Sequence, residues 1–203
     1  MTSRSLIGFP LAGVIIACLY TRATIVLAFM LNGAVIYDFY YMKFKLGVSM
    51  SMSLLILIGM LIFNNYNLWL YYEHDLLSLF IICFITQLSD VYQFIVGQRY
   101  GIFKIGWISP KKTYEGYLYG AIMTIATFVW IINAWDVLFI YTLGCLSGLI
   151  SSILKRSLKI KDYSNLLGLH GGWIDRIDSI ILPVLLYPVF TEKPIAWSIP
   201  FYS

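Results

Sequence analysis

Charged residues are scarce in this chain, at 12% of its 203 residues, whereas soluble domains usually contain about 25%. Hydrophobic residues make up 60%, and the mean hydropathy is +0.81. The core of a soluble protein cannot take up this much apolar sequence, and a disordered chain has the opposite balance of charge and hydrophobicity. The composition therefore excludes both classes and predicts an integral membrane protein.

Cysteine is also rare, and the three cysteines do not form a motif. Cys18, Cys83 and Cys145 each lie in an apolar run, without the spacing typical of a metal site or a disulfide framework. We interpret them as small buried hydrophobic residues. The chain contains no internal repeat, no low-complexity segment and no stretch that fits a separate soluble domain. We therefore expect residues 1–203 to form a single membrane-embedded domain.

Long apolar runs predict an all-α polytopic protein with about seven transmembrane helices. A helix that crosses the bilayer needs about 17–25 mostly apolar residues. The first run could also be a signal peptide, but only Arg4 precedes it and further apolar runs follow, so we interpret it as a span. The expected spans are approximately residues 5–21, 23–42, 49–63, 76–97, 115–134, 136–154 and 174–191.

The basic residues predict the orientation of these spans, because cytoplasmic loops carry an excess of lysine and arginine. With the N-terminus in the cytoplasm, only Arg22 and Lys193 of the 14 basic residues fall outside, which leaves 12 inside. The inside residues are Arg4, Lys43, Lys45, Arg99, Lys104, Lys111, Lys112, Lys155, Arg156, Lys159, Lys161 and Arg176. We therefore expect a protein of the cell (inner) membrane whose polar segments face the cytoplasm.

Three aspartates lie where lipid or apolar protein is expected. Asp90 lies well inside the fourth span, and Asp175 and Asp178 lie at the start of the last one. Asp175 and Asp178 are at positions i and i+3, which share one face of a helix. A carboxylate at membrane depth costs free energy unless it is paired, solvated or bound to a metal. Oxygen ligands suit Mg²⁺, but a structural ion pair with Arg176 or Lys161 explains the same pattern, so both interpretations stay open.

Basic residues gather close to these acids in two places. Lys155, Arg156, Lys159 and Lys161 precede the last span, and Lys111 and Lys112 form a second group. Bases beside anchored carboxylates suit a phosphate substrate and a metal ion. The alternative is that these charges only set the orientation or attract anionic headgroups.

The segment His170-Gly171-Gly172 adds a third feature to this region. The two glycines leave the backbone open for the close approach of an anion. We expect His170 to hydrogen-bond a phosphate or to fix the loop.

The segment SILKRSLKIKDYSNLLGLHGGWIDRID, residues 152–178, resembles the signature of phosphatidate cytidylyltransferases, also called CDP-diacylglycerol synthases. The matching positions are Ser152, Lys155-Arg156, Lys161-Asp162, His170-Gly171-Gly172, Asp175-Arg176 and Asp178. An upstream block, residues 90–116, resembles the same family. Its matching positions are Asp90, Gly97, Gly101, Ser109-Pro110-Lys111-Lys112-Thr113 and Glu115-Gly116.

The resemblance implies that CTP and phosphatidate are converted to CDP-diacylglycerol and pyrophosphate with Mg²⁺, while a second cation stays open. It places the catalytic half at about residues 76–191. CTP would arrive from the cytoplasm and phosphatidate from the lipid bilayer; no nucleic acid is expected, and a homodimer stays open. The implied metal ligands are Asp175, Asp178, Asp90 and Asp162. The implied phosphate-neutralising and catalytic residues are Lys155, Arg156, Lys161, Arg176 and His170. The implied substrate-binding residues are Ser109, Lys111, Lys112, Thr113, Ser152, Gly171 and Gly172.

The chain departs from the family pattern at one position. Members usually carry an acid, thought to be a metal ligand, four positions before the signature serine, and here that position is Gly148. Gly144, Gly148 and Ser152 recur every fourth residue, which also predicts a small-residue face for close helix packing. Two alternatives therefore accompany the main hypothesis: a catalytically impaired homologue with a lipid-binding or scaffold role, and a CTP-dependent enzyme that acts on another lipid phosphate.

Overall fold

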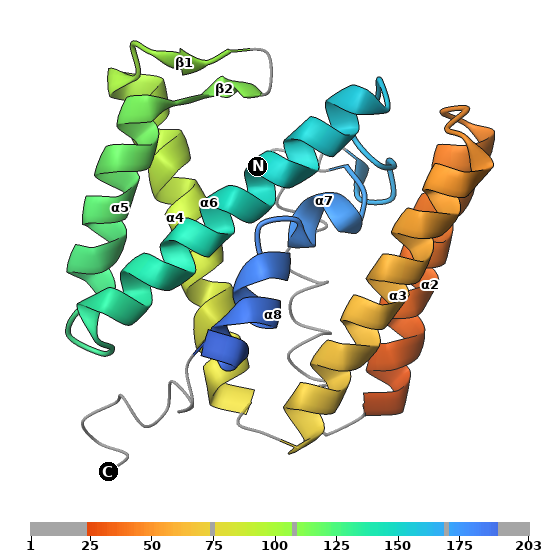
Figure 1. Ribbon diagram of the computed structural model, residues 1–203, viewed down its shortest axis with the longest axis horizontal. Coiled ribbons are helices and arrows are strands. Elements are labelled where there is room, and N and C mark those ends of the chain that lie inside the picture. Colours follow the sequence, from red (N-terminus) through yellow and green to blue (C-terminus); the bar gives the residue numbers. More distant parts are fainter. Residues whose placement is uncertain (1–23, 74–75, 107–108, 169–170, 191–203) are drawn as a thin grey trace. The chain divides into compact units, whose positions relative to one another are not determined.

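The computed structural model describes residues 24–73, 76–106, 109–168 and 171–190, and most of them are helical (Figure 1). The helices are α2 (Thr24–Phe44), α3 (Met50–Glu73), α4 (Leu76–Tyr100), α5 (Tyr114–Phe128), α6 (Ala134–Ser157), α7 (Ile174–Ile177) and α8 (Ile181–Phe190). A short antiparallel hairpin, β1 (Lys104–Ile105) and β2 (Ser109–Thr113), connects α4 to α5. The predicted helical architecture is therefore confirmed, and the hairpin is an addition that the sequence interpretation lacked.

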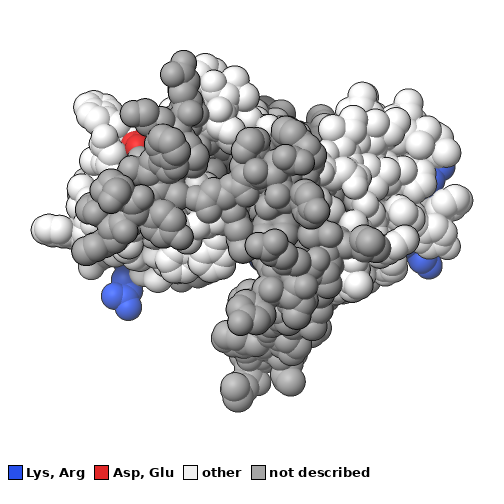
Figure 2. All heavy atoms as spheres, turned by 90° about the horizontal axis from the view of Figure 1, so that it is seen from below, with Lys and Arg blue, Asp and Glu red and all other residues white. Residues whose placement is uncertain are grey.

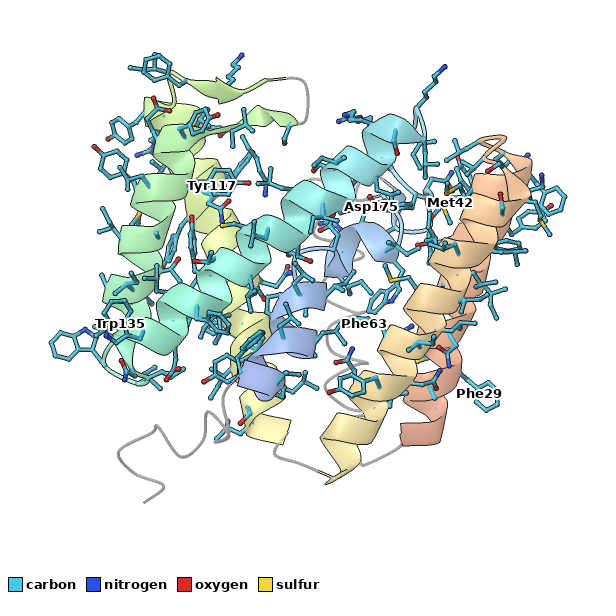
Figure 3. All side chains as sticks on the ribbon, in the orientation of Figure 1. Phe29, Met42, Phe63, Tyr117, Trp135 and Asp175 are labelled. Atoms are coloured by element: carbon cyan, nitrogen blue, oxygen red, sulfur yellow. The ribbon has the colours of Figure 1, made fainter. Side chains whose placement is uncertain are left out.

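Three of the described helices are long and apolar enough to cross a membrane: Met50–Leu68, Leu77–Tyr100 and Ala134–Ser157. Large apolar side chains face outward. Phe29 on α2 and Trp135 on α6 are 77% and 76% exposed and point away from their helices (Figure 3). In the view of Figure 2 the described atoms are almost all uncharged. These features are typical of a membrane protein. The total of seven spans and the cytoplasmic N-terminus stay predictions. The first expected span lies outside the described residues.

The chain divides into two compact units. In the first, the described parts are α2, α3 up to Leu70, and Leu158–Ile177, which includes α7. In the second, they are the remaining end of α3, α4, the hairpin, α5, α6 and α8. The expectation of a single membrane-embedded domain stays a prediction, and each unit is described below by itself.

Glycines allow α4 and α5 to pack closely in the second unit. A Cβ atom on Gly116 would lie 2.9 Å from the backbone oxygen of Gln93 and 3.3 Å from the Cα of Gly97. A Cβ on Gly120 would lie 2.8 Å from the Gln93 side chain. Small residues permit such close backbone contact between membrane helices, and the contact holds the hairpin at the junction of these two helices.

The last expected span, residues 174–191, is interrupted, so its prediction as one continuous helix is wrong. It consists of α7, a turn, and α8. In a regular helix the Leu182 N–H would donate to the Asp178 carbonyl. Instead the Ser147 hydroxyl donates to that carbonyl and accepts from the Leu182 N–H at 3.3 Å. A side chain inserted into the backbone ladder in this way breaks or kinks a helix.

Candidate functional site

The predicted site residues fall into two groups, one in each unit. The Lys112 cluster consists of Asp90 on α4, Lys112 on β2, Tyr117 on α5 and Gly148 on α6. Lys112 Nζ lies 3.6 Å from Asp90 Oδ1 and 5.3 Å from the centre of the Tyr117 ring. Three helices and the hairpin therefore bring an ammonium, a carboxylate and an aromatic face together.

The environment of Lys112 favours its charged form. Burial by itself lowers the pKa of a lysine, but the Asp90 carboxylate and the Tyr117 side chain act in the opposite direction, and the pKa of Lys112 is raised overall. The predicted substrate-binding lysine and the predicted metal ligand Asp90 are thus an ion pair in this structure. Lys112 is a fixed positive charge that a phosphate could recruit.

Gly148 lies directly beside this ammonium. A Cβ atom on Gly148 would lie 3.3 Å from Lys112 Nζ, and among the described residues no other side chain or neighbouring element comes within 4 Å of it. At Gly144 a Cβ would instead lie 3.2 Å from Cγ2 of the buried Thr86. Close helix packing at a small residue, as predicted, is therefore present at Gly144. At Gly148 the neighbouring group is only the flexible end of the Lys112 side chain.

Asp178 forms the second acid–base pair of this unit. Lys155 Nζ donates to Asp178 Oδ2 at 3.2 Å, and the two side chains are 13% and 19% exposed. The Ser147 hydroxyl binds the Asp178 carbonyl and so fixes the turn that carries this carboxylate. Sequence reasoning missed the role of Ser147, which only its place beside Gly148 could have suggested.

The Asp175 cluster belongs to the first unit. It consists of Asp38 on α2, Tyr163 and Ser164, Gly172, and Asp175 on α7. Asp175 Oδ2 accepts the backbone N–H of Tyr163 at 2.8 Å and that of Gly172 at 2.9 Å. Asp175, labelled in Figure 3, therefore ties two parts of the signature segment together.

The two adjacent glycines are required because carboxylates of the same chain approach them. Gly171 has a φ of +79°, and a Cβ on it would lie 2.8 Å from Asp175 Oδ2. A Cβ on Gly172 would lie 2.7 Å from Asp38 Oδ2. Sequence reasoning expected an anion here, and the anions in the structure are Asp175 and Asp38; contact with a substrate phosphate stays a prediction.

Asp38 was not identified from the sequence. It is fully buried, its Oδ1 accepts the Ser164 hydroxyl at 2.5 Å, and its Oδ2 accepts the Ile174 N–H at 2.9 Å. The signal was present, because Asp38 is a lone acid in the apolar run AVIYDFYYM. The argument that drew attention to Asp90, the cost of a carboxylate at membrane depth, applies to it equally.

The remaining predicted residues have other surroundings. Thr113 is the N-cap of α5, where its Oγ1 accepts the Gly116 N–H at 3.1 Å. Ser152 donates to the Gly148 carbonyl of its own helix at 2.8 Å, and Ser109 begins β2. The exposed residues are Arg156, Lys161, Asp162 and Arg176. His170 and the Lys111 side chain lie outside the described part of the structure.

The carboxylates of the described residues fit a magnesium site in which the substrates and water supply most of the ligands. Among the residues that the structure describes, no group of three or more His, Cys, Asp or Glu side chains could hold a metal together. Carboxylate oxygens are nevertheless the ligands that Mg²⁺ prefers, and Mg²⁺ is commonly bound by one or two carboxylates together with substrate phosphates and water. Asp178 or Asp90 could supply such a ligand, with the substrates providing the rest.

Comparison with known proteins assigns the family. The model of the cytidylyltransferase family matches residues 2–192. The chain belongs to this family. It resembles the phosphatidate cytidylyltransferase of Aquifex aeolicus (34% identity over 119 residues, 55% of this chain and 45% of that protein) and that of Bacillus subtilis (32% over 130 residues, 57% and 48%). It also resembles the one from Rickettsia bellii (30% over 160 residues, 69% and 64%).

These comparisons confirm the family that residues 90–116 and 152–178 indicated. The chain spans 45%, 48% and 64% of the length of these three relatives. The activity of the whole protein, its substrates and its partners are therefore stated below as proposals.

The surroundings of Gly148 predict that an aspartate is tolerated there. In Gly148→Asp the new carboxylate would lie beside the Lys112 ammonium, the flexible end of a side chain that can shift, so we expect the free energy of unfolding to fall by less than in the control below. Gly144→Asp is the matched control: it would place a carboxylate against buried Thr86 and should destabilise the protein by about 3 kcal/mol or more. Thermal unfolding of both variants in detergent measures the difference, and equal losses would contradict this description of α6.

Proposed function

We propose that this chain transfers the cytidylyl group of CTP to phosphatidate and releases pyrophosphate, giving CDP-diacylglycerol for phospholipid biosynthesis. The family match over residues 2–192 carries the proposal. The two acid–lysine pairs of the second unit, Asp90 with Lys112 and Asp178 with Lys155, support it. They provide the fixed charges that a reaction between two anionic substrates requires.

The reaction needs no covalent bond to the protein. An oxygen of the lipid phosphate attacks the α-phosphorus of CTP, and the bond from that phosphorus to the oxygen bridging the α- and β-phosphates breaks, so that pyrophosphate leaves. Both reactants are negatively charged, so catalysis consists mainly of charge neutralisation and in-line placement. Mg²⁺ would supply further neutralisation of the phosphate charge.

In this proposal the chain's own residues divide the work. Lys112 and Lys155 would hold phosphate oxygens by exchanging part of their contact with Asp90 and Asp178 for contact with substrate. Asp178, freed from Lys155, would then be available as a metal ligand. Arg156, which is exposed and belongs to the same unit, could reach the triphosphate from the water side; Lys161 of the first unit is also exposed.

The decisive experiment follows two labels of CTP. Purified full chain in detergent receives phosphatidate, Mg²⁺ and CTP labelled either in cytosine or in the γ-phosphate. Cytidylyl transfer should place the cytosine label in the lipid and the γ-label in pyrophosphate. A γ-label in the lipid would instead indicate a CTP-dependent lipid kinase, and no label in lipid at all would indicate the impaired homologue that Gly148 suggests.

A substitution at Asp178 tests the site. We expect Asp178→Asn to lower kcat by about 100-fold or more while the protein stays folded, since the variant would lose a ligand of the Mg²⁺ ion that neutralises phosphate charge. Asp136→Asn, at the first turn of α6, is the matched control and should keep its activity. Near wild-type turnover of Asp178→Asn at limiting Mg²⁺ would show that Asp178 takes no part in metal binding or in the reaction.

We also propose that the Lys112 cluster faces the cytoplasm, in the inner membrane of a bacterial cell. The charge distribution supports this orientation, because the hairpin lies between two expected spans and contains three lysines. A cysteine at Lys104, which is exposed, should react with a membrane-impermeant maleimide only after permeabilisation. A cysteine at Trp135 should react in intact cells. The reverse labelling pattern would indicate the opposite orientation and contradict the proposal.

A further inference from the structure

Asp38 is a buried acid that the proposed reaction does not use. It comes from the middle of α2, and none of its surface is exposed. Its two oxygens bind two positions that are far from it in the sequence and ten residues apart from each other: the Ser164 hydroxyl and the Ile174 N–H. The segment between them contains the His-Gly-Gly sequence and ends directly before Asp175. One carboxylate therefore ties both ends of this segment to α2.

The contacts leave little freedom at this point. A Cβ on Gly172 would lie 2.7 Å from both Asp38 Oδ2 and Ser164 Oγ, so the backbone of Gly172 packs directly against this pair. The N–H of the same residue donates to Asp175 Oδ2 at 2.9 Å. Asp38 therefore fixes the residue before Asp175 by a hydrogen bond and contacts the glycine whose N–H holds the Asp175 carboxylate.

The energetics favour a specific role over passive burial. A carboxylate that is removed from water costs free energy unless charge-assisted hydrogen bonds compensate it. An apolar residue at this position of α2 would avoid this cost. What an apolar residue could not do is accept the Ser164 hydroxyl and the Ile174 N–H together.

We propose that Asp38 is a positioning residue: it holds Ser164 and Ile174 on α2 and thereby sets the position of the Asp175 carboxylate, the metal ligand that the family resemblance implies. The part of this inference that concerns the reaction rests on the proposed function. The part that concerns the loop does not, and the two are measured separately below.

The first measurement is hydrogen exchange of backbone amides in Asp38→Asn, made on the full chain in detergent. Asparagine keeps the shape but loses the charge and presents an NH₂ group to one of the two donors. The exchange rates of the Ile174 and Gly172 amides should rise about ten-fold or more, while amides in α5 and α6 keep their rates, because local opening follows local bonding. A general rise in all helices would mean that Asp38 only stabilises the fold, and unchanged rates would mean that it does not hold the loop; either result overturns the proposal.

The second measurement is steady-state kinetics on the same variant. We expect kcat to fall by about ten-fold or more while KM for CTP stays within about three-fold, the pattern of a lost transition-state arrangement rather than lost binding. Ser53→Ala is the matched control: it removes a buried hydroxyl of α3 that donates to the Ser49 carbonyl of its own helix. It should change neither the exchange of residues 164–174 nor kcat.

The outcomes separate this inference from the proposed function. Locally faster exchange with an unchanged kcat would overturn the positioning role. If the unaltered chain forms no CDP-lipid, the proposed function fails, and the exchange data alone decide whether Asp38 holds the loop. Should Asp38→Asn fail to fold, Ser164→Ala is the second variant; it removes the partner of Asp38 Oδ1 and also the acceptor of the Leu166 N–H. Exchange of the Ile174 and Gly172 amides should still rise, with a smaller amplitude, and unchanged rates at these two amides would overturn the inference.

Discussion

Compensation of buried carboxylates is the constraint on which this structure depends. In a chain with 12% charged residues, each acid removed from water needs a partner. Asp90 has Lys112 and Asp178 has Lys155, whereas Asp38 and Asp175 are held by backbone N–H groups, in the case of Asp38 together with a hydroxyl. These pairings help to hold β2, α7 and the signature segment in place, in addition to the buried apolar side chains of Tyr163 and Ile174.

The two forms of compensation suit different tasks. The ammonium groups of the second unit can release a carboxylate and take up a phosphate, so these pairs can change when substrates bind. The backbone N–H groups around Asp175 and Asp38 cannot move without opening the loop, so those carboxylates act as fixed supports. A reaction that joins an anionic lipid to an anionic nucleotide needs charges of the first kind, which exchange partners when substrates bind. Carboxylates of the second kind keep the loop of the first unit in shape.

The sequence predicted the helical membrane class, whereas the contacts between the predicted site residues were not predicted. Asp90 and Lys112 were identified separately, as metal ligand and substrate ligand, because their contact depends on how α4 meets the hairpin. Asp38 was overlooked because no motif surrounds it, although the cost of its charge was readable. The break between α7 and α8 was missed, although Pro183 in the first turn of α8 was a signal for it. The contribution of Ser147, more than 30 residues away in the sequence, could not be predicted. At Gly148 the pattern suggested helix packing, and only the structure shows the Lys112 ammonium there.

The central claim, that paired charges determine this arrangement, is tested most directly by a double-mutant cycle on Lys155 and Asp178. Lys155→Met alone leaves a mostly buried carboxylate without its ammonium, whereas Lys155→Met with Asp178→Asn removes both charges. Unfolding free energies of the wild type, the two single variants and the double variant give the coupling energy. The account predicts a coupling of about 1–3 kcal/mol, with the double variant more stable than the sum of the single losses implies. Additive losses, with no coupling between the two positions, would contradict it.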